Sequence, residues 1–405
     1  MASLAEVLQR GGPVYLRSHH LSSPQARAWR AICACRTPAL GGQQMACAGC
    51  GHTHWHWHSC RNRHCPQCGA RAKDAWLQGR LAEVLQVPYA HLVFTVPHAL
   101  NSLYRCDPKW FTRVLFASVS DTLKDFAANP RWMGVAGGQP AFSLVLHTWS
   151  QDLSQHLHLH AVMACGVLGP DGLWHAPARR PDFLFPVRAL SPVFRAKFMA
   201  ALVRLSGHTG APQDDNLSLA GRKALYRHAW VVYAKTPLGG PAQVLQYLSR
   251  YTHRTAIGNE RIKAITAGDE VVFSVRADTP GSQRRMRLPS QEFIRRFLLH
   301  VLPNGVQRIR HYGVLANGCK KTQLAQARSA LQQPATSPQA QESARAFMAR
   351  VAGIQTHTCP VCRGPLLVAQ TRPGLKHLPA PGQEPASSQA SPAHPSRRSQ
   401  ARAPP

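Results

Sequence analysis

Three histidines alternate with apolar residues in one short segment of the chain. His156, His158 and His160 are separated by Leu157 and Leu159. Successive side chains of a β-strand point to opposite faces of the sheet, so this spacing places the three imidazoles on one face. A solvated, histidine-rich surface is the alternative interpretation, and it would suffice for one or two histidines. Three in alternation favour a metal site, because neutral imidazole is a common metal ligand.

Two Cys-x-x-Cys pairs lie close together near the N-terminus. Cys47 and Cys50 form the first pair, and Cys65 and Cys68 form the second, with 14 residues between them. Four thiolates at this spacing are typical of a tetrahedral structural zinc site, which has no open position for chemistry. We therefore predict a Zn²⁺ ion bound by these four cysteines, with Cys60 as an alternative to Cys65. Zinc binding would also supply the folding energy that a short, irregular segment lacks.

A third Cys-x-x-Cys pair lies far from the other two. Cys359 and Cys362 have only His357 and Cys319 as further metal-binding residue types near them in the sequence. A lone pair is a weak signal, since a structural zinc site needs four ligands. We interpret this pair as one half of a site whose other half the sequence does not identify.

Two tyrosines lie four residues apart after a Gly-Gly-Pro turn. A helix is expected over 242–254, and it places Tyr247 and Tyr251 on one face. Taken alone, this spacing is more typical of packing residues in an amphipathic helix. A phenol becomes a nucleophile when its ionised form is stabilised, and Arg250 and Arg254 carry charge that could do so. Both tyrosines are therefore candidate nucleophiles, and both arginines are candidate DNA contacts.

Basic residues are concentrated towards the C-terminal part of the chain. Between residues 284 and 321 there are nine lysines and arginines and a single acidic residue, Glu292, with aromatic residues interleaved. Bases combined with aromatic side chains suit a surface that follows a single strand of nucleic acid and stacks on its bases. A solvated helix face is the alternative for any one of them. The predicted DNA contacts in this block are Arg295, Arg296, Arg308 and Arg310.

The overall charge supports an interaction with nucleic acid. The 405 residues include 48 lysines and arginines against 18 acidic residues, which gives a formal charge of +30. Such a protein attracts polyanions and binds them in a salt-dependent way. No apolar run approaches the roughly 20 residues that span a bilayer, and residues 1–11 are amphipathic rather than a signal peptide. We expect a cytoplasmic, DNA-binding protein without a membrane partner, in which clustered cysteines bind metal.

Strands and helices must position these residues. The expected strands alternate with helices, which is typical of an α+β fold with an antiparallel sheet and helices packed on it. An irregular segment is expected over 36–70, around the cysteines. The strands are expected at 91–96, 141–147, 156–168, 229–235 and 270–276. The helices are expected at about 24–35, 72–86, 108–129, 242–254 and 290–302.

Composition divides the chain into three parts. Residues 1–75 are expected to form an N-terminal helix and a small zinc-knuckle domain, and residues 76–325 a catalytic domain. Residues 326–405 contain a C-terminal helix, the lone cysteine pair and, from residue 373, a basic tail. Proline, serine, alanine, glutamine and arginine dominate that tail, so it is predicted to be disordered.

Together these motifs resemble the HUH-type transposases of the insertion sequence ninety-one family, including their common-region relatives. The resemblance covers most of residues 30–325. The sequence departs from the family's pattern at Leu157, where proline is usual, and at 164–167, where a glycine-rich run is usual. The matching segments are a knuckle at 59–66, a strand at 94–98, a histidine motif at 158–160, a tyrosine motif at 247–254 and basic segments at 293–297 and 308–313.

The resemblance implies a chemistry. In an HUH endonuclease core, His158 and His160 would bind Mg²⁺ or Mn²⁺ with a third ligand, for which His156, His253 and Gln246 are candidates. The metal would polarise a phosphate in the single-stranded ends of a mobile element. One tyrosine would attack it, forming a 5′-phosphotyrosine link and a free 3′-hydroxyl, and the second would attack the other end. This is rolling-circle transposition by a bacterial, nucleoid-associated strand transferase.

Two other functions fit part of the sequence. A zinc-ribbon DNA-binding regulator would explain the charge and the cysteines but would leave the histidines and tyrosines without a role. A replication initiator or a conjugative relaxase would share the HUH chemistry, but the zinc knuckle followed by this tyrosine motif argues against it. A regulator that retains its zinc should bind DNA without any further divalent metal, which separates it from both enzymes.

Overall fold

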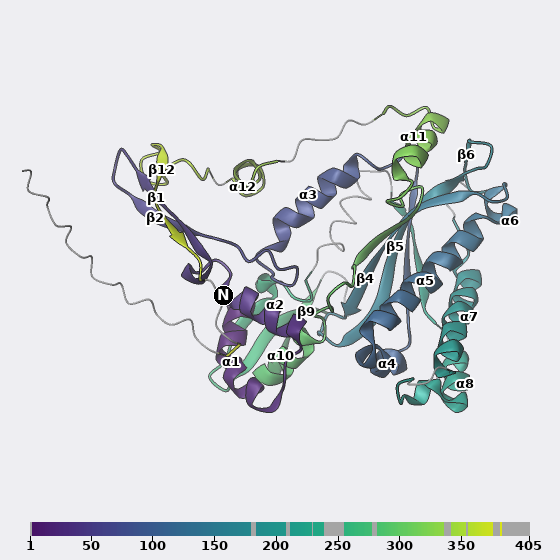
Figure 1. Ribbon diagram of the computed structural model, residues 1–405, viewed down its shortest axis with the longest axis horizontal. Helices are drawn as coiled ribbons and strands as arrows, with labels where there is room; N and C mark the ends of the chain where they lie inside the picture. The colour runs from purple at the N-terminus through teal and green to yellow at the C-terminus, as the bar shows by residue number, and fades with distance from the viewer. Residues whose placement is uncertain are drawn as a thin grey trace, which may run out of the picture.

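The structure of the protein is a computed structural model. The described residues form three antiparallel sheets with helices packed around them (Figure 1), which confirms the predicted α+β class. None of the described helices is long and apolar enough to cross a membrane. The structure describes residues 2–179, 184–207, 211–228, 230–238, 255–277, 282–335, 342–353, 355–375 and 381–382.

A six-stranded sheet, the central sheet, dominates one end of the molecule. Its strands lie in the order β11-β4-β5-β3-β7, and the short β6 pairs with the end of β5. β5 is the longest, since its 14 residues include no proline and a single glycine. The strands are β3 (Tyr89–Thr95), β4 (Gln139–Trp149), β5 (Gln155–Leu168), β6 (Trp174–His175), β7 (Val232–Leu238) and β11 (Ile309–Gly313).

Two long helices cover one face of the central sheet. They are α5 (Pro108–Ala127) and α7 (Val187–Ser206), and Figure 1 shows both on the same side of it. Asp107 caps α5, because its carboxylate accepts hydrogen bonds from two amides of the first turn. Leu157 and Leu159 of β5 are buried in the core beneath these helices. The histidines that alternate with them therefore point to the opposite face, here named the histidine face.

Two other helices pack on part of the histidine face. These are α3 (Gly69–Leu81) and α11 (Lys320–Ala330). Trp76 of α3 and Leu324 of α11 contact a small apolar cluster that includes Val162 of β5. The end of β5 that carries the histidines lies outside this cluster.

A second, three-stranded sheet joins the N-terminal helices to a distant part of the chain. Its order is β10-β9-β8, and it shares one apolar core with three helices. Leu4 and Leu8 from the N-terminus are fully buried in this core together with Phe273 and Phe293. The elements are β8 (Ile262–Ile265), β9 (Glu270–Arg276), β10 (Gln283–Pro289), α1 (Leu4–Ser18), α2 (Ser23–Ala34) and α10 (Ser290–Leu298).

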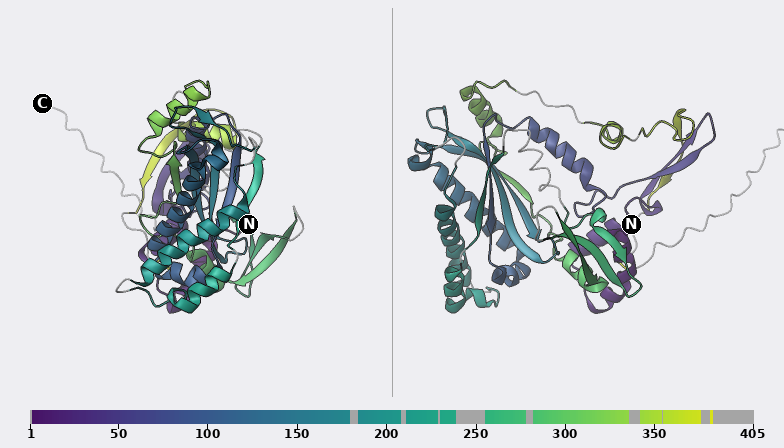
Figure 2. Two further views of the ribbon diagram at one scale, coloured as in Figure 1. Left: turned by 90° about the vertical axis from the view of Figure 1, so that its right-hand side faces the viewer. Right: turned by 180° about the vertical axis from the view of Figure 1, so that it is seen from behind.

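A third sheet brings the two ends of the chain together. It consists of β1 (Gly41–Cys47), β2 (Thr53–Trp57) and β12 (Leu366–Pro373), in the order β12-β1-β2. Figure 2 shows it at the far end of the molecule from β6 and α6. The expected irregular segment over 36–70 therefore contains two strands, which corrects that prediction. β12 was not expected from the sequence.

The remaining elements are short. They connect the larger elements, and α12 lies beside α3 in Figure 1 and in the right-hand view of Figure 2. The helices are α4 (Asn101–Cys106), α6 (Pro130–Met133), α8 (Leu219–Arg227) and α12 (Ala344–Ala352), and the 3-10 turns are η1 (Pro38–Leu40), η2 (His98–Leu100), η3 (Asp215–Leu217) and η4 (Asn259–Arg261).

Most of the expected elements have a counterpart. The expected strands at 91–96, 141–147, 156–168 and 270–276 correspond to β3, β4, β5 and β9. β7 begins at Val232, three residues later than expected, and α7 was not expected. The expected helix over 242–254 and most of the tail expected from residue 373 lie outside the described residues. The division of the chain at residues 75 and 325 stays a prediction.

Candidate metal and DNA-binding site

Three histidines meet on the histidine face and form what we name the histidine cluster. His147 of β4 lies directly opposite His158 of β5 in the strand register, and His160 is the next residue of β5 on the same face. Each offers one ring nitrogen, and these three atoms lie within 4.8 Å of one another. Nε2 of His160 and Nδ1 of His147 are 3.1 Å apart. Nitrogens bound to one ion at about 2.1 Å each lie at about this separation, so the cluster is compact enough for a single metal.

Neighbouring groups orient two of these rings. Nδ1 of His158 lies 3.0 Å from the backbone oxygen of His156, so Nδ1 donates this hydrogen bond and Nε2 is left to bind a metal. Nδ1 of His160 lies 2.9 Å from Nε2 of His91, a buried residue of β3. When Nδ1 of His160 is the donor, its Nε2 presents a lone pair towards His147. His91 is therefore placed to hold His160 in the metal-binding tautomer.

Burial surrounds the histidine cluster and favours the neutral form of the His158 ring. His147 is 4% exposed and His160 is 7% exposed. Burial, reinforced by the neighbouring His156, lowers the pKa of His158 to about 4, because an imidazolium loses its hydration in the interior. The His158 ring is therefore neutral at pH 7, which is the form that binds a metal.

The structure places His147, rather than His156, together with His158 and His160. Nδ1 of His156 instead lies 2.8 Å from Nε2 of His98. His147 thus becomes the candidate for the third ligand, and the identity of that ligand stays a prediction. The sequence predicts that His147 belongs to the strand at 141–147. The register that sets β4 against β5, and His147 against His158, cannot be read from either strand alone.

Several predicted site residues lie outside the described residues. They include both candidate nucleophiles, Tyr247 and Tyr251, and the candidate DNA contacts Arg250 and Arg254. The alternative third ligands, His253 and Gln246, belong to the same segment. Their roles stay predictions.

The structure divides the predicted zinc ligands between two cysteine clusters. Cys65 and Cys68 do not meet Cys47 and Cys50, so the prediction of one site built from both pairs is wrong. Each pair instead lies beside two other cysteines. The first cysteine cluster consists of Cys35, Cys60, Cys65 and Cys68, and the second consists of Cys47, Cys50, Cys359 and Cys362.

The first cysteine cluster lies between the end of α2 and the start of α3. The Sγ atom of Cys68 is 3.4 Å from that of Cys35 and 3.6 Å from that of Cys60. Cys60, predicted as a substitute for Cys65, is thus a partner of it. Hydrogen bonds from the thiols of Cys60 and Cys65 lower the pKa of Cys35. A thiolate surrounded by thiols is a suitable donor set for a zinc ion, which displaces the remaining protons.

The arginines predicted near α10 are already engaged within the protein. Glu292 accepts a hydrogen bond from Nε of Arg295 and another from Nε of Arg296, each at 2.6 Å. These contacts, the Arg295 bond foremost, lower the pKa of Glu292 to about 2. Arg296 also donates to the backbone oxygen of Asp152 at 3.0 Å. Contact of these arginines with DNA stays a prediction.

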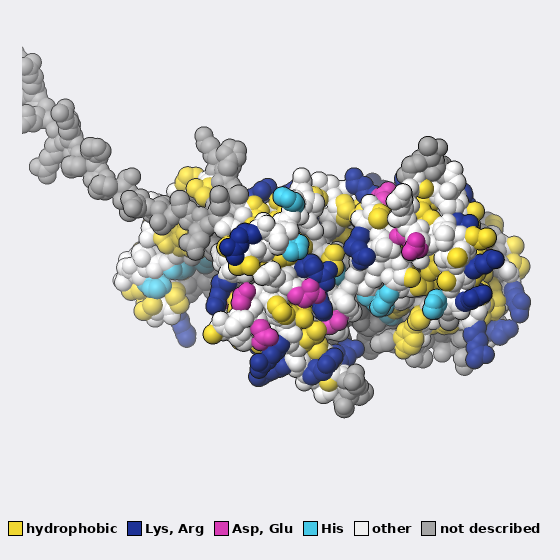
Figure 3. Space-filling model, turned by 90° about the horizontal axis from the view of Figure 1, so that it is seen from below, with side chains coloured by type: hydrophobic (Ala, Val, Ile, Leu, Met, Phe, Trp, Pro, Cys, Tyr) yellow, Lys and Arg dark blue, Asp and Glu magenta, His cyan; other side chains and the backbone are white. Residues whose placement is uncertain are grey.

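The two arginines of the β11 region stack on aromatic rings. Arg308 lies 4.9 Å from the ring centre of Trp149 and donates to the backbone oxygen of Leu146, and burial lowers its pKa to about 9. Arg310 lies 4.1 Å from the ring centre of Phe116. Both side chains are half-buried, and their contact with DNA also stays a prediction. Figure 3 shows other lysines and arginines spread over one face of the molecule, several beside acidic side chains.

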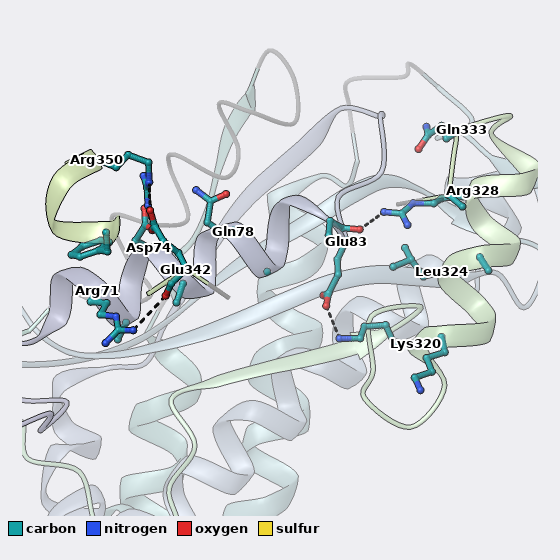
Figure 4. Close-up of a pocket in the computed structure, with 18 of the residues that line it drawn as sticks. Arg71, Asp74, Gln78, Glu83, Lys320, Leu324, Arg328, Gln333, Glu342 and Arg350 are labelled. Atoms are coloured by element: carbon teal, nitrogen blue, oxygen red, sulfur yellow. Dashed lines mark hydrogen bonds and ion pairs between the residues drawn. The ribbon is translucent and has the colours of Figure 1, made fainter. Parts of the chain in front are cut away.

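A cleft of about 1630 Å³ lies between α3, α11 and α12. Figure 4 shows its lining side chains projecting from these three helices. Glu83, which follows α3, forms an ion pair with Lys320 at 2.6 Å. Asp74 of α3 forms another with Arg350 of α12. The sequence did not predict this cleft, because its walls come from three separate segments. Its basic residues are Arg61, Arg71, Lys320, Lys321, Arg328 and Arg350, against the acidic Asp74, Glu83 and Glu342.

Family models match two adjoining parts of the chain. Residues 7–96 match a model described as "Transposase zinc-binding domain". Residues 141–323 match a model described as "Putative transposase". The first match contains the first cysteine cluster, and the second contains the histidine cluster.

Individual proteins are similar over most of the chain. "Putative transposase y4qJ" of Sinorhizobium fredii is 39% identical over 391 residues, which cover 93% of this chain and 97% of the relative. The "Transposase for insertion sequence element IS801" of Pseudomonas savastanoi is 27% identical over 70% of this chain and 68% of its own. Among solved structures, a metal-bound conjugative relaxase TrwC in complex with OriT DNA overlaps 51% of this chain and 69% of its own, with 15% identity and a TM-score of 0.26.

Proposed function

This chain belongs to the insertion sequence ninety-one family of transposases, and we propose that it cleaves and rejoins single-stranded DNA through a covalent tyrosine link during rolling-circle transposition. The observation that carries the proposal is the histidine cluster. His147, His158 and His160 are buried, and each offers a ring nitrogen within 4.8 Å of the other two on the histidine face. A DNA-binding regulator would have no use for such a cluster.

The donor set of the histidine cluster suits a transition-metal ion. Three neutral imidazoles are offered, whereas Mg²⁺ prefers oxygen ligands in octahedral geometry. We therefore propose Mn²⁺ rather than Mg²⁺ as the ion to test first. When bound, such an ion would draw charge from a non-bridging oxygen of the scissile phosphate and so make the phosphorus more electrophilic.

The nucleophile we propose is the phenol of Tyr247 or Tyr251. Its oxygen forms a bond to phosphorus as the bond from phosphorus to the 3′ oxygen breaks, and the phenolic proton is lost to solvent while the leaving oxygen gains one. The product is a 5′-phosphotyrosine link and a free 3′-hydroxyl. Because one phosphodiester is exchanged for another, the link can be resealed when a 3′-hydroxyl attacks it. The second tyrosine allows the other end to be held at the same time.

The ends of the tyrosine segment support this assignment. The described chain leaves the central sheet at Leu238 of β7 and resumes at Thr255. Shortly after that point, Arg261 donates a hydrogen bond to the backbone oxygen of Gln151 in the turn between β4 and β5. That turn is at the end of the sheet that carries the histidine cluster. After the residues that contain both tyrosines, the described chain thus resumes within a few residues of a contact with the turn between the two histidine-bearing strands.

The proposal is tested by trapping the covalent link. Single-stranded oligonucleotides that tile both flanks of the gene are incubated with the full chain and Mn²⁺, and protein–DNA adducts are separated under denaturing conditions. We expect an adduct with the wild type and none with a Tyr247→Phe/Tyr251→Phe double variant. Tyr226→Phe is the matched control, since Tyr226 is an exposed tyrosine of α8. An adduct that is as abundant with the double variant as with the wild type would overturn the proposal.

A further inference from the structure

The second cysteine cluster joins segments that lie far apart in the chain. Cys47 and Cys362 are separated by 315 residues, yet their Sγ atoms are 3.4 Å apart, and those of Cys50 and Cys359 are 3.6 Å apart. All four sulfur atoms lie within 4.8 Å of one another. Each contact crosses from one Cys-x-x-Cys pair to the other, so neither pair is complete alone.

The two cysteine pairs lie on turns of the same design. In each turn the backbone amide of the first cysteine donates a hydrogen bond to the carbonyl oxygen of the residue five positions after it. The backbone amide of the residue four positions after the first cysteine donates a hydrogen bond to the carbonyl oxygen of that cysteine. The residue at that fourth position has a positive φ in both turns, +70° at Gly51 and +61° at Arg363. The bonds are Cys47 to His52 (2.9 Å), Gly51 to Cys47 (3.0 Å), Cys359 to Gly364 (2.8 Å) and Arg363 to Cys359 (3.0 Å).

This repetition points to a common ligand. A positive φ is unfavourable for a side chain such as that of Arg363, and it persists where the surroundings require it. The turn directs both sulfur atoms of its pair to the same side, and it aims backbone amides of Gly49 and Cys50 at the sulfur of Cys47. Two such turns facing each other present four sulfur atoms to one point, which is the arrangement of a closed tetrahedral zinc site.

Apolar packing around this cluster is too limited to hold the third sheet. Among the described residues, the buried apolar cluster here contains only Met45 and Leu366 besides Cys47 and Cys359. The sheet has three short strands, and one of them, β12, comes from the other end of the chain. A sheet of this size needs a further source of stability, and a metal ion is the usual one in small domains.

We propose that Cys47, Cys50, Cys359 and Cys362 bind one structural zinc ion, distinct from the ion of the first cysteine cluster, and that this ion fastens the C-terminal segment to the N-terminal part of the chain. The pairing of β1 with β12, from Gly41 opposite Pro373 to Cys47 opposite Leu366, is the contact that the ion completes. Neither family match includes both halves of this site.

The proposed ion also bears on the cleft in Figure 4. The segment that leads to Cys359 includes α12, and Arg350 of α12 forms an ion pair with Asp74 of α3. Arg71 of α3 lies near the backbone oxygen of Glu342 just before α12. Fastening β12 to β1 therefore limits how far α12 can move from α3, and so keeps one wall of the basic cleft in place.

Zinc content tests the proposal independently of catalysis. The full chain is purified with reduced thiols, and zinc per chain is measured by elemental analysis. We expect Cys359→Ser/Cys362→Ser to contain about one zinc ion fewer than the wild type. A Cys106→Ser/Cys319→Ser variant is the matched control, because these cysteines belong to neither cluster, and it should retain the wild-type zinc content. Equal zinc content in the wild type and in Cys359→Ser/Cys362→Ser overturns the proposal.

Two further variants separate misfolding from loss of a ligand. Cys60→Ser/Cys68→Ser should lose the ion of the first cluster and keep the second, and combining it with Cys359→Ser/Cys362→Ser should remove both. If Cys359→Ser/Cys362→Ser loses all its zinc while Cys60→Ser/Cys68→Ser loses one ion, the two clusters do not bind independently, and the proposal of a distinct second site fails. The Tyr247→Phe/Tyr251→Phe variant should keep its full zinc content, so failure of the adduct assay leaves this result unaffected.

Discussion

The histidine cluster and the second cysteine cluster are built in opposite ways. His147, His158 and His160 lie on two adjacent inner strands, within 14 residues of sequence, in a sheet whose other face covers a large apolar core. The four cysteines lie on two turns separated by more than 300 residues, beside a small apolar cluster. The fold alone brings the histidines together, whereas the cysteines need their ion to stay together. The proposed catalytic site is thus preformed by the fold, whereas the proposed structural zinc site depends on its ion to hold its two turns together.

Removing a ligand of the histidine cluster should abolish activity while leaving the fold intact. For His160→Ala we expect the single-turnover rate of adduct formation to fall on the order of 10³-fold, because polarisation of the phosphate is worth several kcal/mol. The melting temperature should change little compared with that loss. His156→Ala is the matched control on the same face of β5, and its rate should stay within a few-fold of the wild type. A similar loss for both variants would show that the cluster is not the metal site.

Acid should destabilise the fold, because the buried His300 must take up a proton when the chain unfolds. Burial lowers the pKa of His300, which lies between Leu153 and Thr148, to about 4, against about 6.5 in an unfolded chain. Between these values the unfolded chain binds more protons, so the stabilisation is complete above about pH 6.5 and is lost as the pH falls to about 4. The loss from this residue is about 3 kcal/mol. Urea unfolding at pH 7 and pH 4.5 measures it.

The matched variant for the acid experiment is His300→Gln, whose amide can keep both hydrogen bonds but does not titrate. It should lose less stability than the wild type over the same pH interval. An identical pH dependence of the two proteins would assign the acid sensitivity to other groups, such as His158.

Weakening the support of one ligand should have a smaller effect than removing it. His91→Ala deletes the hydrogen-bond partner of His160, and we expect the Mn²⁺ concentration needed for half-maximal adduct formation to rise about 10- to 100-fold. The rate at saturating Mn²⁺ should change less. His91→Gln, which can still accept a hydrogen bond from His160, should recover part of the affinity. An unchanged Mn²⁺ requirement in His91→Ala would mean that the strands alone orient His160.

Removal of zinc by chelation should give the smallest of these effects, and it should affect the third sheet but not the central sheet. When zinc is removed by a strong chelator, we expect hydrogen exchange of the β1 amides to speed up about tenfold, because the third sheet loses its main support. Amides of β5 should exchange at an unchanged rate. Mass spectrometry of peptides from both strands gives the comparison in one experiment. Equal acceleration in β1 and β5 would show that zinc stabilises the whole molecule rather than this sheet.

The sequence predicted those parts of the site that depend on local periodicity. Alternation places His158 and His160 on one face whichever strand lies beside them, and the apolar residues between them face the core. The partner of His158 depends on the register of β4, which is set by the turn at 150–154 and not by the residues of β5. His147 could therefore be seen in the sequence as part of a strand, but not as a ligand.

The predicted grouping of the zinc ligands is wrong because cysteines that are close in the sequence lie in different clusters of the structure. Cys47 and Cys65 are close along the chain, but β2 lies between their turns. The partner of the first pair is the Cys359/Cys362 pair, which the sequence shows only as one half of a site. By contrast, the ion pairs of Glu292 with Arg295 and Arg296 could have been read from their spacing of three and four residues on one helix.

The pairing of β12 with β1 also orders events during synthesis. Cys47 leaves the ribosome 315 residues before Cys362, which corresponds to roughly 15–60 s at about 5–20 residues per second. The histidine cluster is complete well before that interval ends, since its last member is residue 160. A chain truncated by a premature stop after the central sheet can thus assemble its histidines but never the second cysteine cluster. The complete third sheet therefore forms only in molecules that were synthesised at least as far as β12.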